Sequence, residues 1–120
     1  LEFRRVLFRS VSIVRSIIHD PPVMIFDEPT AGLDILTARN IVSFIRDCKQ
    51  RGKCVLFSTH IMREAERLAD RIVMIHKGKI LADGTLEELR NISSQIDLDD
   101  IFVYYINQHT DEQELRANEF

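Results

Sequence analysis

The stretch VMIFDEPTAGLD, residues 23–34, sets an apolar strand next to two carboxylates and a turn. Its first four residues form an apolar run without polar alternation, which is typical of a parallel strand buried on both faces. Asp27 and Glu28 follow directly, so both carboxylates stand where this strand ends. Pro29 then fixes the backbone, and Gly32 permits a conformation that other residues resist. The stretch therefore predicts polar chemistry at the end of a stiff strand.

Apolar spacing beyond this stretch predicts alternating strands and helices. The expected order is a strand at 23–26, a helix whose apolar face runs from 38 to 48, a strand at 54–57, a helix at 61–69 and a strand at 72–75. Gly52 is expected to end the first of these helices. Strands that alternate with helices in this way predict an α/β fold with a parallel sheet.

The C-terminal part of the chain predicts a hairpin followed by helices. The tight turn HKGK leads into the apolar residues 80–82, so the third strand is expected to pair antiparallel with a fourth. Thr85 and Glu88 match a capping box, which predicts the start of a helix over 86–90. Apolar spacing over 98–105 predicts a last amphipathic helix. The polar tail beyond it is compatible with either frayed helix or disorder.

Polar side chains follow each of the first two predicted strands. Asp27 and Glu28 follow the first strand, whereas Ser58, Thr59 and His60 follow the second. Because chemistry in parallel sheets collects at the carboxyl ends of the strands, we expect both groups at the same rim. Asp27 suits a hydrated magnesium ion, which prefers oxygen ligands. Glu28 is suited to orient a water molecule that attacks a phosphoryl group.

Three sequence segments together resemble one enzyme family. DEPTAGLD at 27–34, with its apolar lead, resembles the Walker B segment and D-loop of ATP-binding cassette (ABC) ATPases. FSTHIMREAERLADRIVMIHKGKILADGT at 57–85 resembles the H-loop, its helix and the closing hairpin of that family. VSIVRSIIHDPP at 11–22 resembles the helix that follows the family's signature loop. The resemblance implies part of a P-loop NTPase sheet, with mostly parallel strands, flanking helices and a C-terminal β-hairpin.

The resemblance also implies a role for individual residues. Asp27 is expected to hold magnesium through water, and Glu28 to be the catalytic carboxylate that polarises the attacking water. His60 corresponds to the switch histidine, which is catalytic and reaches the γ-phosphate of ATP. Asp34, in the D-loop, is expected to act across an ATP-sandwiched dimer. The implied cofactors are thus ATP and magnesium.

The combination of DEPTAGLD, STHIMREAERLADR and a short hairpin resembles exporter-type subunits, including those of bacterial sodium export and multidrug export. It implies a separate membrane permease and a second ATPase subunit as partners, and a cytoplasmic place at the inner face of the cell membrane. A net charge of -3 provides no basic field for nucleic acid. Two alternatives stay open: a soluble ABC ATPase of DNA repair or translation, and a non-catalytic interaction module.

The phosphate-binding loop of this family is missing from the sequence. That loop has the pattern G-x-x-x-x-G-K-[ST], and none of the four glycines of the chain stands in such a pattern. We therefore expect a C-terminal fragment of an ABC ATPase that is marginally stable and binds no ATP detectably by itself. Tight, magnesium-dependent ATP binding by the 120-residue chain in calorimetry would contradict this expectation.

The opening segment LEFRRVLFRS, residues 1–10, resembles nothing in the family. Natural divergence or an N-terminal helix would explain it, but Glu2-Phe3 can be encoded by the cloning site GAATTC. Residues 6–10 can be encoded by GTGCTCTTCCGATCT, the end of a common sequencing adapter. We therefore expect residues 1–10 to derive from an adapter and 11–90 to form the ATPase part. Residues 91–120 are then a helical, partly disordered extension.

Overall fold

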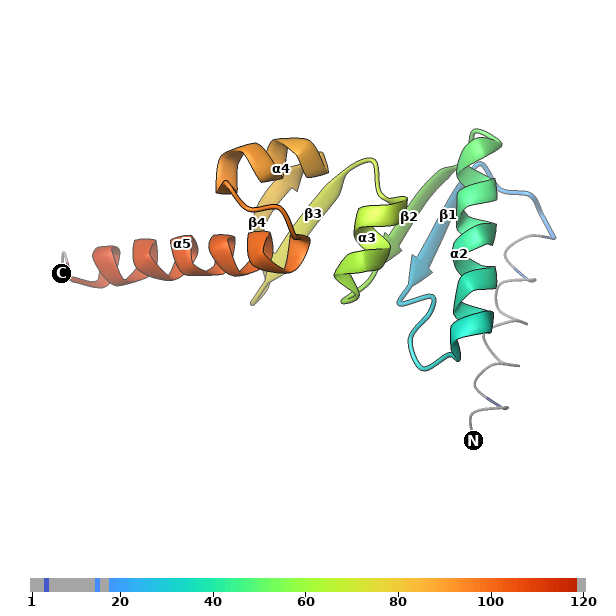
Figure 1. The fold of residues 1–120 in the computed structure, drawn as a ribbon, viewed down its shortest axis with the longest axis horizontal. Coiled ribbons are helices and arrows are strands. Elements are labelled where there is room, and N and C mark those ends of the chain that lie inside the picture. The colour runs from blue at the N-terminus through green and yellow to red at the C-terminus, as the bar shows by residue number, and fades with distance from the viewer. Residues whose placement is uncertain (1–3, 5–14, 16–17, 119–120) are drawn as a thin grey trace. The chain divides into compact units, whose positions relative to one another are not determined.

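The computed structural model describes residues 4, 15 and 18–118 (Figure 1). The chain divides into two compact units, Leu1–Ile61 and Met62–Phe120, and each is described by itself. Most of the expected helix at 11–18 and of the opening segment 1–10 lies outside the described residues. The helix at 11–18 and the adapter origin of residues 1–10 are therefore still predictions.

The first unit contains a parallel strand pair and one long helix. Strand β1, Val23–Asp27, pairs in parallel with β2, Cys54–Ser58, and the connection between them carries helix α2, Ile35–Gln50. Both strands have five residues, and they pair from Val23 opposite Cys54 through to the last residue of each strand. The predicted strand–helix–strand order is confirmed here, and the two strands end at the same level.

The sequence explains why α2 forms where it does. Asp34 caps its N-terminus, and its buried side chains are Ile41, Ile45 and Cys48, as the helical spacing predicts. The ring of Phe44 meets that of Phe26 edge to face, at a centroid distance of 6.3 Å. This contact joins the helix to β1. Past the C-cap residue Arg51, Gly52 has a positive φ of 81°, which ends the helix as expected.

The prediction that the first strand is buried on both faces is wrong for the residues that the structure describes. Met24 and Phe26 are buried, whereas Val23 is 53% exposed and Ile25 is 71% exposed. Leu56 on β2 is 62% exposed. Successive side chains of a strand point to opposite faces, and α2 packs against this strand pair. The exposed side chains thus form a bare apolar face on the strand pair.

The second unit begins with a short helix and continues with a hairpin and two helices. Its elements are α3 Met62–Leu68, β3 Ile72–His76, β4 Lys79–Gly84, α4 Leu86–Ser93 and α5 Leu98–Asn118. The sequence predicts one mostly parallel sheet, whereas the described strands form two two-stranded sheets, β1 with β2 and β3 with β4. The antiparallel pairing of β3 with β4 is confirmed. A positive φ at Lys77 and Gly78 gives the tight turn that joins them.

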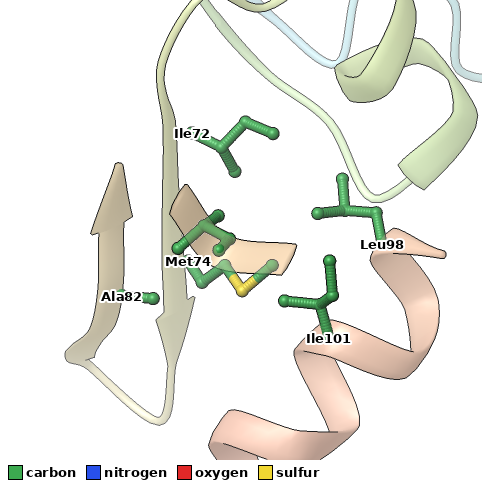
Figure 2. Close-up of a cluster of buried hydrophobic side chains, with 6 residues drawn as sticks. Ile72, Met74, Ala82, Leu98 and Ile101 are labelled. Atoms are coloured by element: carbon green, nitrogen blue, oxygen red, sulfur yellow. The ribbon is translucent and has the colours of Figure 1, made fainter. Parts of the chain in front are cut away.

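The hairpin and helices of this unit share one hydrophobic core (Figure 2). Its buried members are Ile72, Met74, Ala82, Leu89, Leu98 and Ile101. Figure 2 shows Leu98 and Ile101 pointing from α5 toward Met74 on β3. Met62 and Ala65 of α3 pack against the same cluster. The start of α5 is therefore part of the core rather than an appendage to it.

Side-chain hydrogen bonds stabilise the first turns of the two C-terminal helices. At α4, Thr85 Oγ1 accepts from the Glu88 N–H at 3.2 Å and Glu88 Oε2 accepts from the Thr85 N–H at 3.1 Å, so the predicted capping box is confirmed. At α5, Glu66 Oε1 accepts from the Leu98 N–H at 2.9 Å. The polar tail is helical as far as Asn118. Within the described ranges, no helix combines the length and apolarity that crossing a membrane requires.

Candidate functional site

Contacts at the N-terminal ends of β1 and β2 hold the two strands in register. Lys53 Nζ lies 2.7 Å from Asp20 Oδ1 and donates to the Asp20 carbonyl oxygen at 3.1 Å. The adjacent Cys54 N–H donates to the Pro22 carbonyl at 2.9 Å. These contacts tie together the two segments that enter the strands. Because both strands then run for five residues, their polar ends meet at one edge.

At that edge, Asp27 lies opposite Ser58. The Ser58 hydroxyl donates to Asp27 Oδ1 at 2.5 Å. The N–H of Glu28 donates both to the Ser58 carbonyl at 3.0 Å and to Ser58 Oγ at 3.1 Å. The predicted meeting of the two polar groups at one rim is therefore confirmed. Ser58, which the sequence places in the rim without a role, contacts both carboxylate residues.

The backbone at Glu28 has an unusual conformation. Its φ is +46°, in the left-handed region that residues with a side chain rarely adopt. A compact turn follows, in which the Ala31 N–H donates to the Glu28 carbonyl at 3.2 Å and Gly32 has a φ of 71°. Pro29 and Thr30, the central residues of this turn, are buried. The surrounding contacts hold Glu28 in a conformation that its own sterics disfavour.

The Glu28 carboxylate meets the imidazole of His60. Glu28 Oε2 lies 2.9 Å from His60 Nδ1, and the side chains are 33% and 73% exposed, respectively. An ionised carboxylate only accepts hydrogen bonds, so this contact places a proton on Nδ1. Thr59 Oγ1 accepts from the Ile61 N–H at 3.0 Å, which closes the turn around His60. In this pair the Glu28 carboxylate is the hydrogen-bond acceptor, and the contact does not involve Nε2 of His60.

Asp34 lies at the N-terminus of α2, away from this contact network in the sequence. Its Oδ1 accepts from the Thr37 N–H at 2.8 Å and its Oδ2 accepts from the Thr37 hydroxyl at 3.0 Å. The backbone hydrogen bond from Thr37, followed by that from the Thr37 hydroxyl, lowers the pKa of Asp34 below its ordinary value. Asp34 therefore acts as a helix cap here, a local role that the sequence analysis does not anticipate.

The donor chemistry of this edge fits a magnesium ion. Magnesium usually binds through one or two carboxylates plus substrate phosphates and keeps several of its waters. Asp27 supplies an exposed carboxylate that is oriented by the Ser58 hydroxyl, and Glu28 adds a second carboxylate next to it. Among the described residues, no group of three or more His, Cys, Asp or Glu side chains is placed to hold a metal without other ligands.

Known proteins resemble this chain over most of its length. ABC transporter ATP-binding protein NatA of Bacillus subtilis is 42% identical over 101 residues, which are 84% of this chain and 41% of NatA. Nod factor export ATP-binding protein I of Burkholderia lata is 38% identical over 91% of this chain and 35% of its own length. A solved structure of the ATP-binding subunit of an ABC transporter has a TM-score of 0.67 and 36% identity. The chain belongs to the family of ABC transporter ATP-binding proteins.

The likeness to these ABC proteins covers only part of their length. The solved ABC subunit is matched over 72% of this chain and 37% of its own chain. The chain thus spans about two fifths of the relatives that it matches. No protein-family model matches the chain. The α/β elements described above, with their parallel and antiparallel strand pairs, therefore correspond to one portion of an ABC ATP-binding subunit.

Proposed function

We propose that this chain forms the part of an ABC transporter ATPase subunit that carries the hydrolytic residues. The observation that supports this best is the contact between Glu28 Oε2 and His60 Nδ1 at 2.9 Å. These two residues come from the ends of different strands, and parallel pairing brings them to one edge. In an ABC ATPase, such an edge faces the terminal phosphate of ATP.

Glu28 acts on the attacking water. Its carboxylate accepts a hydrogen bond from the water and draws electron density toward the oxygen that attacks the γ-phosphorus. The bond from the γ-phosphorus to the bridging oxygen then breaks, and ADP leaves with that oxygen. His60 donates from Nδ1 to Glu28, and in the imidazolium form it would also donate from Nε2 to the γ-phosphate oxygens. Both groups are partly exposed, which leaves them accessible to a nucleotide.

Asp27 would orient the water molecules around a magnesium ion. A magnesium ion, when bound, neutralises charge on the phosphate oxygens. Asp27 would hold it through water, because the side chain is exposed at the strand end and one of its oxygens already accepts from Ser58. The donor set matches the hard oxygen chemistry that this ion prefers.

The partners of this subunit follow from the transporter family. We propose a separate membrane permease, with the chain at the cytoplasmic face of the membrane, and a second ATPase subunit that completes an ATP sandwich. Asp34 is exposed at the start of α2 and would contact that second subunit. Export is the proposed direction, because relatives named for Nod factor export are among the similar proteins.

The chain alone is proposed to be inactive. Its sequence lacks the glycine-rich loop that holds the phosphates of ATP, so Glu28 and His60 have no positioned substrate. Hydrolysis is therefore tested in a chimera, in which this chain replaces the matching segment of NatA. Unmodified NatA provides the reference for folding and for ATP binding.

The test substitutes Glu28→Gln in that chimera. We expect turnover to fall by about a hundredfold or more, because the amide cannot accept the proton, while ATP binding is retained. Glu114→Gln, at an exposed carboxylate on α5, is the matched control and should leave turnover unchanged. Undiminished hydrolysis in the Glu28→Gln chimera would remove Glu28 from the catalytic role.

A further inference from the structure

Ser58 is the last residue of β2, and it contacts both carboxylate residues of β1's polar end. Its hydroxyl donates to Asp27 Oδ1 at 2.5 Å and accepts from the Glu28 N–H at 3.1 Å. Its carbonyl accepts from the same N–H at 3.0 Å. Three hydrogen bonds therefore connect one serine to two neighbouring residues that are proposed to have different roles.

We propose that Ser58 is a positioning residue for hydrolysis, orienting the Asp27 carboxylate and holding the backbone of Glu28. The inference rests on the proposed function and names the residue that sets the geometry of that site. Ser58 itself would not touch the substrate. It acts through Asp27, which would hold the hydrated metal, and through Glu28, which would polarise the water.

The contact with Asp27 fixes a side chain that would otherwise turn freely. Asp27 is exposed at the end of its strand. The Ser58 hydroxyl engages Oδ1, so the carboxylate plane is set by the pairing of the two strands. Hydrogen-bond partners of metal-binding carboxylates orient the ligand and tune its strength as a donor. Loss of the hydroxyl would leave this carboxylate with several orientations.

The contacts with Glu28 hold a backbone that is strained. A φ of +46° is disfavoured for glutamate and persists only where neighbouring groups stabilise it. The Glu28 N–H is shared between the two Ser58 oxygens, which fixes the peptide group that enters this residue. That peptide sets the direction in which the Glu28 side chain leaves toward His60. The serine hydroxyl thus helps to position both the carboxylate that would hold the metal and the carboxylate that would polarise the attacking water.

The first experiment measures amide hydrogen exchange of the 120-residue chain by NMR. In Ser58→Ala, we expect the Glu28 amide to exchange about threefold to tenfold faster, because one of its two acceptors is lost. Ser58→Thr keeps the hydroxyl and should restore the original rate. Ser43→Ala, at an exposed serine on α2, is the matched control and should leave the rate unchanged. Equal rates at Glu28 in all four proteins would overturn the proposal.

The second experiment uses the NatA chimera and separates binding from turnover. We expect Ser58→Ala to lower kcat about threefold to tenfold and to raise the magnesium concentration needed for half-maximal rate, with little change in KM for ATP. Ser58→Thr should recover both quantities. A merely structural serine would lower the amount of folded protein without shifting the magnesium requirement, and that result would overturn the proposal.

The two proposals fail in different ways. If Glu28→Gln hydrolyses ATP at the rate of the parent chimera, the proposed function fails. If Glu28→Gln is inactive but Ser58→Ala matches Ser43→Ala in kcat and in magnesium requirement, the function stands and the role of Ser58 is refuted.

Discussion

Ile101→Ala is expected to destabilise the second unit strongly. Ile101 is completely buried, and it packs with Met74 and Leu98 in the core of Figure 2. The substitution removes three carbon atoms at about 0.8 kcal/mol each, or about 2.4 kcal/mol of transfer free energy. The cavity that is left raises the total to about 3–4 kcal/mol. A unit of this size has roughly 3–9 kcal/mol of stability, so the loss is a large part of the whole.

The assay is urea unfolding followed by tyrosine fluorescence. The chain has two tyrosines and no tryptophan, and Tyr104 and Tyr105 both lie in α5, so the signal reports the second unit alone. We expect Ile101→Ala to lower the urea midpoint by about 2–3 M, and Ile101→Val to lower it by about 1 M or less. Val103→Ala is the matched control on the same helix, because Val103 is 53% exposed. Equal midpoint shifts for Ile101→Ala and Val103→Ala would refute the packing of α5 described above.

Three further predictions concern the surface and the helix caps. The Arg71 Nε–Asp83 Oδ1 hydrogen bond at 2.7 Å lowers the pKa of Asp83, so this contact stabilises the fold above about pH 4 and stops doing so as the pH falls through the lowered pKa. The difference in urea midpoint between the parent and Asp83→Asn should therefore shrink between about pH 6 and about pH 3. A difference that stays constant over this range would contradict the stabilising role of the contact. Ile25→Thr should reduce light scattering by the 120-residue chain without loss of circular dichroism, because Ile25 is 71% exposed; unchanged scattering would count against the bare apolar face. Thr85→Ala should cost about 1 kcal/mol in the tyrosine assay through loss of the capping box, whereas Thr110→Ala on α5 should cost less.

Local sequence patterns predicted the elements well. The apolar runs predicted the four strands that lie within residues 18–118, and the T-x-x-E pattern at Thr85 predicted the start of α4. The meeting of Glu28 with His60 was also predictable, because parallel strands bring their carboxyl ends to the same edge. In each case a short-range pattern or a general rule of topology was sufficient.

The features that the sequence did not predict depend on contacts made in three dimensions. An apolar run indicates burial but not which segment covers each face, so Ile25 was expected to be buried and is exposed. The division of the described strands into two two-stranded sheets, instead of one mostly parallel sheet, likewise depends on the packing around the strands rather than on their composition. The left-handed backbone of Glu28 arises from its hydrogen bonds to Ser58 and has no signal in the residue type. A parallel register drawn from the equal lengths of β1 and β2 would have paired Asp27 with Ser58 and so indicated this serine.

The most direct measurement of the central claim is a double-mutant cycle on ATP hydrolysis in the NatA chimera. Glu28→Gln, His60→Ala and the double variant are compared with the parent at saturating ATP and magnesium. Because Glu28 Oε2 and His60 Nδ1 lie 2.9 Å apart, we expect the two residues to act as one unit. The double variant should then be no slower than the slower single variant. Losses that multiply in the double variant, or single variants as active as the parent, would contradict the account.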